Sequence, residues 1–232
     1  MWKQKLREFQ NQGTKAVRLP REFFIRDGIT VAKELLGKVL VHETKEGTIR
    51  GIITEVESYM GVNDKGAHTY GGRRTERTEP MFHIGGTSYV YFTYGMYYCM
   101  NITTELAETP QAVLIRSVVP ADEASKELML QLRMAVMLEK ARKRKAKQGE
   151  ALREREIQRM QKNTMKHLAD GPGKMCIAMG ITKADNDVDM VTSPAFYVTR
   201  GISVDPAEIQ AGKRIGIDYA EEAADYLWRF YL

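Results

Sequence analysis

A strand-like segment, GIITEVESYMG at residues 51–61, opens the stretch of sequence that decides the fold. A polar segment, AHTYGGRRTERTEPMF at 67–82, and a tyrosine-rich run, YVYFTYGMYYCMN at 89–101, complete it. The pair Tyr94-Gly95 interrupts the tyrosine-rich run, and such a pair between two strand-like runs predicts the tip of a hairpin. We therefore expect a strand, a long polar loop and a hairpin that projects an aromatic ring.

The alternation of side chains on these strands gathers chemical groups on one face. Successive side chains of a strand point to opposite faces, so Glu55, Glu57 and Tyr59 share one face of the first strand. Tyr89 and Tyr91 likewise share a face of the hairpin. Carboxylates next to rings, arginines in the intervening loop and a protruding ring together indicate an enzyme that acts on an unstacked nucleic-acid base.

Length and composition favour one globular domain. A chain of 232 residues with 43% apolar residues can bury one sizeable core, and no Pro/Gly/Ser-rich linker divides it. We expect a single domain over 1–232 with a basic helical insertion at about 121–167. The chain lacks an apolar run of membrane-spanning length and a secretory signal, and its two cysteines imply no disulfide framework. These features predict no membrane partner and a reducing, cytoplasmic location.

The positive charge is concentrated in one segment. The net charge is +5 and the pI is near 9.1, yet 11 Lys or Arg stand against four Asp or Glu between Glu139 and His167. The basic pI therefore says little about the rest of the chain. Strong helix formers predict helix over 121–167, with Gly149 as the main breaker. Two interpretations are open: a solvated helical pair that projects from the domain, or a DNA-backbone contact through KARKRKAK.

Further elements follow from apolar periodicity and from helix-stop signals. Apolar positions in ITVAKELL predict a helix that Gly37 ends, and the first dozen residues resemble a frayed helical tail. A loop that feeds a short helix is expected at GPGKMCIAMGI. Strands are predicted at 38–42, 48–59, 88–93, 97–103, 111–118, 195–202 and 214–218.

Glu57 is the first candidate for catalysis, as a general base. The simpler interpretation is a solvated or ion-paired strand carboxylate. Glu55 lies two positions away on the same face, and like charges at that distance make one carboxyl harder to ionise. A base must be ionised, so the hypothesis requires a nearby cation. Arg116 is the candidate, because it interrupts the apolar strand VLIRSV and a buried charge needs a partner.

His68 and Tyr94 each allow two interpretations. His68, in DKGAHTYGG, has no second histidine or cysteine at metal-ligand spacing, so we expect no metal site. It is either an ordinary surface residue or the wall of a pocket. A ring at the position of Tyr94 either folds back on its own hairpin or inserts into a nucleic-acid stack.

Arg73, Arg74 and Arg77 flank or follow the Gly71-Gly72 pair of the polar loop. Arginines beside glycines suit contacts with the DNA backbone, because bare main chain permits close approach and the guanidinium binds phosphate oxygen. Surface solubility is the alternative. The chain has no G-x-S-x-G, Walker A or dinucleotide-binding motif, which argues against the enzyme classes that depend on them.

Taken in order, several motifs resemble the alkyladenine DNA glycosylase family, the 3-methyladenine DNA glycosylases of the mammalian type that bacteria also have. The resemblance covers nearly the whole chain. The motifs are ELLGKVLV, GIITEVESYMG, AHTYGGRRTERTEPMF, GTSYVYFTYGMYYCMN, VLIRSVVP, DGPGKMC, RIGIDYA and the terminal WRFYL.

The resemblance implies an α+β fold, in which a single compact domain has a curved antiparallel β-sheet surrounded by helices, like the C-terminal domain of formyltransferases. It implies a monomeric, monofunctional enzyme without a cofactor, associated with the nucleoid, whose partner is double-stranded DNA with damaged purines. Such an enzyme flips purines such as 3-methyladenine, hypoxanthine or ethenoadenine out of the duplex. It then hydrolyses their N-glycosidic bond and leaves an abasic site.

The functional residues of the family transfer to matching positions of this sequence. Glu57 falls on the general base, and Arg116 on the arginine beside the catalytic water. Asn101 falls on the pocket asparagine that disfavours the exocyclic amine of guanine. The pocket residues that enclose the flipped base match Tyr59, His68 and Tyr91. The intercalating residue of the hairpin matches Tyr94.

Two features depart from the family pattern, and two other functions stay open. The basic segment after Val119 is longer than in a minimal member, and the turn between Asn101 and Arg116 is slightly long.

One alternative function is a non-catalytic nucleic-acid-binding module on a related fold, in which Glu57 is structural. The other is an N-ribosidase for free nucleosides, which would leave Tyr94 without a role.

Overall fold

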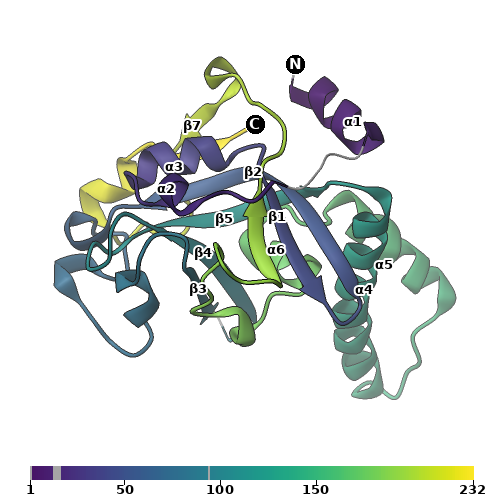
Figure 1. Cartoon of the computed structure of the whole chain (residues 1–232). Helices are drawn as coiled ribbons and strands as arrows, with labels where there is room; N and C mark the ends of the chain where they lie inside the picture. Colours follow the sequence, from purple (N-terminus) through teal and green to yellow (C-terminus); the bar gives the residue numbers. More distant parts are fainter. Residues whose placement is uncertain (1, 13–16, 94) are drawn as a thin grey trace.

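One long strand, β2 (Gly47–Tyr59), organises the structure. The computed structural model describes residues 2–12, 17–93 and 95–232. β5 (Gln111–Pro120) pairs with one edge of β2, while β1 (Val39–Thr44) and β8 (Arg229–Tyr231) share its other edge. β1 covers the first part of that edge and β8 covers Glu55–Glu57, so β2 has neighbouring strands on both sides over most of the part from Gly51 onward (Figure 1).

The other strands extend this sheet on both sides. Among the described residues the sheet has eight strands, in the order β3-β4-β5-β2-β1-β6, with β8 joining β2 to β7. Every strand pairing is antiparallel, which confirms the predicted α+β class. The strands not yet located are β3 (Ser88–Thr93), β4 (Tyr97–Thr104), β6 (Phe196–Thr199) and β7 (Gln210–Gly212).

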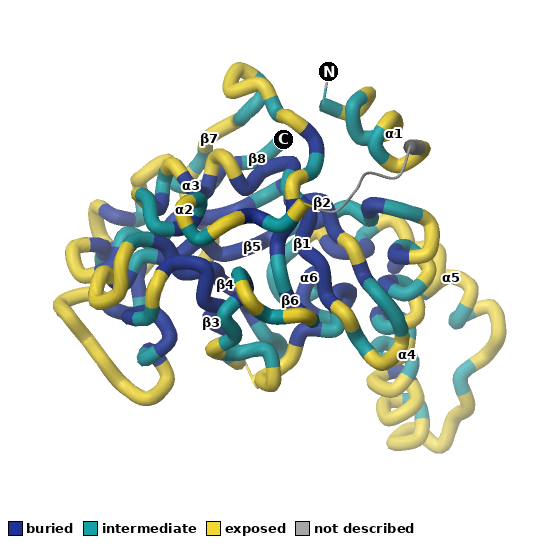
Figure 2. The backbone as a smooth tube through the Cα atoms, viewed as in Figure 1, coloured by how far each residue is buried: buried dark blue, intermediate teal, exposed yellow. Residues whose placement is uncertain are grey.

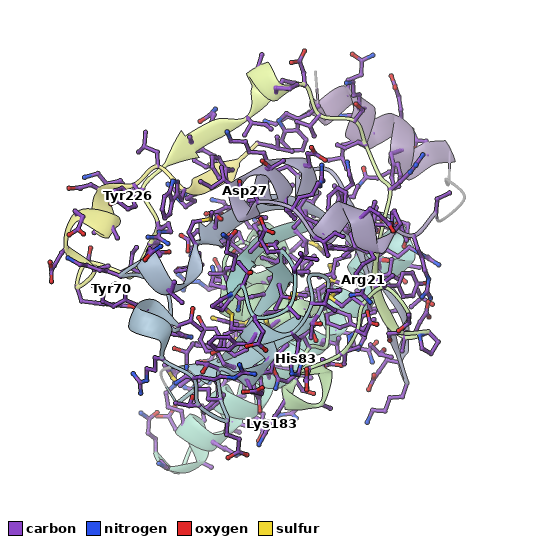
Figure 3. All side chains as sticks on the ribbon, turned by 60° about the vertical axis from the view of Figure 1, so that its left-hand side comes forward. Arg21, Asp27, Tyr70, His83, Lys183 and Tyr226 are labelled. Carbon is purple, nitrogen blue, oxygen red and sulfur yellow. The ribbon has the colours of Figure 1, made fainter. Side chains whose placement is uncertain are left out.

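Helices pack on the sheet from two directions (Figure 1). α3 (Gly28–Leu35) contacts β2 and β5, and Asp27, labelled in Figure 3, caps its first turn. α4 (Glu123–Ala146) contacts β2 and β5, and α6 (Pro172–Ala178) contacts β4 and β5. The two helices also contact each other. The other helices are α1 (Trp2–Gln12), α2 (Arg21–Phe24) and α5 (Glu154–Lys166), with short 3₁₀ turns at Gly61–Asn63, Tyr70–Gly72, Glu79–Phe82, Lys183–Asp185, Pro206–Glu208 and Glu221–Asp225.

The core lies between the sheet and the helices α3, α4 and α6, as Figure 2 shows by the buried tube of the central strands. Burial of these apolar side chains is the main favourable term for folding. No helix in the described part of the chain has the length and apolar character needed to cross a bilayer. The largest fully buried side chains include Phe24, Leu35, Leu36, Leu40, Ile49, Ile52, Ile53, Met100, Ile102, Ile115 and Phe196.

The basic segment folds as two helices, as its composition predicted. The break between α4 and α5 contains Gly149 in a left-handed conformation. Met129 and Arg133, on the first half of α4, are buried against the core, whereas the second half of α4 and most of α5 are exposed (Figure 2). The segment is therefore partly a core helix and partly a projecting pair.

The predicted strand at 214–218 is wrong. The backbone N–H of Ile215 donates to the carboxylate of Glu57, and the side chain of Arg214 forms a buried ion pair with Asp64. The polar groups of this segment therefore find partners outside any strand ladder. β7 and β8 were not predicted from the sequence, because three residues are too few to show the alternation of a strand.

The N-terminal segment is helical, as predicted, but α1 packs on the domain instead of forming a frayed tail. α1 packs Trp2, Leu6 and Phe9 against a small apolar cluster on β1 and β2. Positions 2, 6 and 9 lie on one face of a helix, so the apolar spacing was the signal that the analysis overlooked.

We expect Gly37→Ala to destabilise the fold more than Gly149→Ala. Both glycines have left-handed φ angles, +81° and +68°, which cost a residue with a side chain about 1–2 kcal/mol. A Cβ on Gly37 would also lie 2.6 Å from the backbone oxygen of Ile202, whereas a Cβ on Gly149 meets nothing within 4 Å. Urea unfolding of both variants measures the difference, and equal losses would contradict a role for this close approach.

Candidate active site

The cross-strand register gathers side chains from five strands in one row on the sheet. Residues that are directly opposite in antiparallel strands point to the same face. The strands β3, β4, β5, β2 and β8 are neighbours in that order at this level of the sheet. The row consists of Tyr89, Asn101, Leu114, Glu57 and Arg229.

Arg116 lies two residues after Leu114 on β5 and therefore points to the same face, at an irregularity in the pairing of β5 with β2. The residues on either side of Arg116 have partners in β2, whereas Arg116 itself falls at the shift of register. β-bulges are frequent next to active sites. The guanidinium of Arg116 reaches both carboxylates, with Nε 2.9 Å from Glu55 Oε1 and Nη1 3.2 Å from Glu57 Oε1.

The carboxylate of Glu57 is fully buried and is held by groups from three segments. Oε1 accepts the backbone N–H of Ile215 at 2.7 Å and also faces Arg116. Oε2 accepts the hydroxyl of Tyr59 at 2.9 Å. A buried charge is stable only with such partners, so this part of the sheet is built around an acidic side chain.

Burial raises the pKa of Glu57 above the ordinary carboxyl value. The positive charge of Arg116 and the hydrogen bonds from Ile215 and Tyr59 offset only part of this rise, and Glu55 adds to it. A carboxyl whose pKa is raised in the folded state stabilises the fold at low pH, and this contribution is lost as the pH rises through the raised value. Near neutral pH the ionised Glu57 therefore costs stability.

The two side chains next to Glu57 keep their protons. Burial raises the pKa of Tyr59 well above its ordinary value, and the negative charge of Glu57 raises it further, so the phenol remains a donor. Burial lowers the pKa of Arg116, but Glu57 and Glu55 outweigh burial and the net direction is upward. Arg116 therefore remains a cation beside the carboxylate.

A cavity of about 230 Å³ opens on this row. Tyr59, Arg116 and Ile215 line it, and Glu57 lies behind these three partners rather than in the wall itself. The volume is below the roughly 300–1,000 Å³ of pockets for drug-sized ligands, which suits a flat group of the size of one base. Other lining residues that matter for the chemistry are His68, Tyr89, Tyr91, Cys99 and Asn101.

Three rings meet on one side of the cavity. The ring centroids of Tyr89 and Tyr91 are 5.1 Å apart, and the ring of His68 stands nearly perpendicular to Tyr91 at 4.7 Å. Nδ1 of His68 makes a 2.9 Å hydrogen bond with the hydroxyl of Tyr89. Burial and the positive charges of Arg77 and Arg73 lower the pKa of His68 to about 4, so the imidazole is neutral at physiological pH.

Asn101 is a rigid part of the wall. Its side chain is buried on β4, and Nδ2 donates to the backbone oxygen of Tyr89 at 3.1 Å. This hydrogen bond to the neighbouring strand holds the amide in one orientation. A fixed amide can discriminate between ligands by shape as well as by hydrogen bonding.

The three arginines of the polar loop divide into two groups. Arg73 and Arg77 line a depression of about 290 Å³ that adjoins the base-sized cavity and shares part of its lining. Arg74 is instead paired with Glu79 and Glu108, each at 2.6 Å. Arg74 thus already has carboxylate partners, whereas Arg73 and Arg77 have none among the described residues, although the guanidinium of Arg77 lies 5.0 Å from the ring centroid of Tyr91.

β3 and β4 form the predicted hairpin, but Tyr94 at its tip lies outside the described residues. Phe92 and Met96 stand on either side of this position, and 51% and 57% of their surface is exposed. Exposed apolar side chains at the end of a hairpin are typical of a binding surface. The intercalating role of Tyr94 stays a prediction.

A larger cavity, of about 970 Å³, lies between α2, α3 and the residues around 200–211. Its lining includes the ion pair of Arg26 with Glu34 and none of the residues that surround Glu57. No cluster of His, Cys, Asp and Glu that could hold a metal ion occurs in the described part of the chain. The buried carboxylate with a retained cation makes the smaller cavity the candidate for chemistry.

The sequence analysis missed several residues of this cavity. Cys99 is opposite Tyr91 in the hairpin register, so strand alternation was a usable signal for it. Leu114 alternates with Arg116 on β5 and could have been found in the same way. Ile215 could not, because only the tertiary fold brings its backbone to Glu57. Both cysteines of the chain are free and buried.

The comparisons with known proteins identify a family. A family model described as methylpurine-DNA glycosylase matches residues 22–232. Three similar bacterial proteins are each named "Putative 3-methyladenine DNA glycosylase". That of Clostridium acetobutylicum is 45% identical over 93% of this chain and 94% of its own, and that of Clostridium novyi is 44% identical over 93% and 94%. That of Desulfitobacterium hafniense is 43% identical over 93% and 95%. The chain therefore belongs to the methylpurine-DNA glycosylase family.

Proposed function

We propose that this protein excises damaged purines from duplex DNA by hydrolysis of the N-glycosidic bond. The observation that carries the proposal is the fully buried carboxylate of Glu57, held against Arg116 behind a cavity of the size of one base. The names of its relatives support 3-methyladenine as a substrate. Hypoxanthine and ethenoadenine are further proposed substrates. The protein acts as a single-domain monomer on DNA in the cytoplasm.

The target nucleotide is proposed to leave the helix before the reaction. A base inside a duplex is stacked and paired, so an enzyme that acts on its glycosidic bond must flip it into a pocket. The cost is a few kcal/mol and is smaller for a damaged base. Tyr94 is proposed to fill the vacated stack, and the exposed Phe92 and Met96 beside it support a hairpin that enters DNA.

Glu57 is the proposed general base. A water molecule adds to C1′ of the sugar while the bond from C1′ to the purine nitrogen breaks, and the purine leaves with the bonding electrons. Glu57 takes the proton that the water loses. Arg116 favours the ionised carboxylate, and the donors from Tyr59 and Ile215 orient it. No lysine is among the described lining residues, so we expect an abasic site in an intact strand rather than a Schiff base.

The walls of the cavity supply recognition of the base. Tyr59 and Tyr91 are proposed to stack on the purine, and each stacking contact is worth roughly 1–3 kcal/mol. The neutral His68 adds a wall that does not repel a cationic alkylated purine. The fixed amide of Asn101 is proposed to disfavour the exocyclic amine of guanine.

Contact with the DNA backbone is proposed for Arg73 and Arg77. Their depression adjoins the cavity, and a nucleotide whose base occupied the cavity would bring phosphates to its rim. Guanidinium groups bind phosphate oxygen strongly. Arg74 is the weakest of the three candidates, because its two carboxylate partners would compete with phosphate.

A binding module without catalysis is the main alternative. It would retain the rings and arginines, but it would not need an acidic group whose ionisation costs stability. Residues whose pKa is shifted by burial in a cleft are enriched at catalytic sites, and the raised pKa of Glu57 favours the enzyme for this reason.

Glu57→Gln should lower single-turnover excision of hypoxanthine or ethenoadenine from duplex oligonucleotides about 10²–10⁴-fold, the range for loss of a general base. Glutamine keeps the shape of the side chain and an oxygen for Ile215 and Arg116, so lesion binding should survive. Thermal unfolding at neutral pH should show no loss of stability, since a costly buried charge is removed. Glu79→Gln, at an exposed carboxylate, is the matched control. Near-normal excision by Glu57→Gln would refute the role of this residue.

Excision of a cationic alkylated purine should decline on the acid side with a midpoint above 4.5, the ordinary carboxyl value, because burial raises the pKa of Glu57. The rate falls as the pH falls, since the protonated carboxyl cannot accept a proton from water. His68, with a pKa of about 4, should add no step near pH 6.5, so His68→Gln should keep the same midpoint. A pH–rate profile of the single-turnover constant checks both, and a midpoint at or below 4.5 would contradict Glu57 as the base.

Arg73→Gln should reduce the slope of log affinity against log salt by about 0.9, the value for one phosphate contact on duplex DNA. Arg74→Gln should leave this slope nearly unchanged, because Arg74 is already paired within the protein. Binding titrations with undamaged duplex at several salt concentrations compare the two. Equal slopes for the two variants would contradict the assignment of the phosphate contact to Arg73 rather than Arg74.

A further inference from the structure

Arg214 is a buried cation that the proposed chemistry does not use. Its side chain and that of Asp64 are both fully buried, and the two guanidinium nitrogens contact the Asp64 carboxylate at 2.5 and 2.7 Å. The same nitrogens donate to the backbone oxygens of Ser58, at 3.0 Å, and Ala223, at 3.1 Å. Arg214 therefore ties the end of β2 and the loop after it to the C-terminal part of the chain.

Two aromatic rings accompany the guanidinium. Cζ of Arg214 lies 4.8 Å from the ring centroid of Tyr59 and 5.0 Å from that of Trp228. Its Nε finds no hydrogen-bond acceptor among the described residues. A buried N–H without an acceptor is unfavourable, and a buried ion pair can often be replaced by apolar residues without loss of stability. Stability alone therefore does not account for an arginine at this position.

Arg214 contacts both of the uncharged donors that hold Glu57. Ile215 follows Arg214 directly, and its N–H reaches Glu57 Oε1 at 2.7 Å. Tyr59, whose ring lies against the guanidinium, donates its hydroxyl to Glu57 Oε2 at 2.9 Å. The third partner, Arg116, comes from β5. Arg214 thus acts on the orientation of the Glu57 carboxylate indirectly, through two of the three groups that hold it.

The space around Arg214 is tight on the side of the cavity. Gly66 lines the cavity, and a Cβ at this position would lie 2.9 Å from Nη2 of Arg214 and 3.1 Å from Cδ1 of Ile217. Asp64 also accepts the backbone N–H of Gly66. The loop after β2 and the segment that carries Ile215 therefore meet at Arg214 with no room for a side chain between them.

We propose that Arg214 is a positioning residue for the general base, which holds the N–H of Ile215 and the hydroxyl of Tyr59 against the carboxylate of Glu57. This inference rests on the proposed role of Glu57. Asp64 balances the charge of Arg214, so the contribution of Arg214 is geometric rather than a direct attraction for the carboxylate. Its loss should weaken the base more than it weakens binding of the damaged nucleotide.

Arg214→Lys tests the proposal. Lysine keeps the charge next to Asp64 but lacks the planar fork that reaches Asp64, Ser58 and Ala223 together. We expect single-turnover excision at neutral pH to fall about tenfold or more, and the acid-side midpoint to rise by about one pH unit, the shift for one lost hydrogen bond to a charged group. Affinity for an ethenoadenine duplex, followed by the fluorescence of the lesion, should change less than the rate.

The shift of the midpoint reports on the donors because the other groups around Glu57 are unchanged in this variant. The charge at position 214 is also retained. The titratable groups that face Glu57 are Arg116 on β5, Glu55 and Tyr59 on β2, Cys99 on β4, and Arg229 on β8, which pairs with Glu55.

Gly66→Ala is the second variant, and it alters no charge. The added methyl group should displace Nη2 of Arg214 and raise the midpoint in the same direction. Arg21→Lys is the matched control, because Arg21, labelled in Figure 3, forms a partly buried pair with Asp189 far from Glu57 in the chain. The control should lower thermal stability without moving the midpoint.

A wild-type rate and midpoint in folded Arg214→Lys or Gly66→Ala would overturn the proposal. Reduced stability with an unchanged midpoint would overturn it as well, because that result describes a purely structural ion pair. If Arg214→Lys does not fold, Gly66→Ala decides the question. Normal excision by Glu57→Gln would instead refute Glu57 as the base on which this inference rests, and failure of the wild-type protein to excise any of the lesions would refute the proposed function itself.

Discussion

A carboxylate buried in the middle of a sheet is the feature on which the rest of this site depends. The charge of Glu57 is stable there only because donors arrive from β2, from β5 and from the C-terminal segment. Tyr59 follows from regular alternation on β2, whereas the other two donors stand at departures from regular structure. β5 carries a bulge at Arg116, and the segment at Ile215 gives its N–H to a side chain instead of a strand.

These departures make the site a compromise between stability and chemistry. Burial raises the pKa of Glu57 even with its partners in place, so the folded protein holds the ionised carboxylate at a cost. The positive charge of Arg116 opposes this rise and favours the ionised form of Glu57. A general base benefits from this balance, because a pKa closer to the ambient pH makes proton transfer from water easier.

In the proposed function, the charge distribution would separate recognition of DNA from recognition of the base. Around the cavity, each of the most buried arginines is matched by a carboxylate, as in the pairs of Arg116 with Glu57 and Arg214 with Asp64. Arginines without a carboxylate partner among the described residues lie at the rim, namely Arg73 and Arg77, the second of which lies 5.0 Å from the ring centroid of Tyr91. This arrangement suits a ligand with an anionic backbone and a flat base, since phosphates meet open cations while the base enters a cavity whose charges are already balanced.

The sequence by itself determined the features that depend on local periods. Alternation placed Glu55, Glu57 and Tyr59 on one face, the Tyr94-Gly95 pair predicted the hairpin, and helix formers predicted α4 and α5. It also identified Arg116 as a buried cation in need of an acidic partner. These inferences hold because side-chain direction in a strand or helix follows from neighbours a few residues away.

Only the tertiary structure decided which of these groups meet. The row from Tyr89 to Glu57 depends on the register of the strands, and this register also sets Arg116 against Glu55 and Glu57. Ile215, 158 residues from Glu57 in the chain, was taken for part of a strand. Its N–H turns to the carboxylate because Arg214 is locked to Asp64. Contacts over such separations are set by the packing of the whole chain, which the local spacing of residues does not encode.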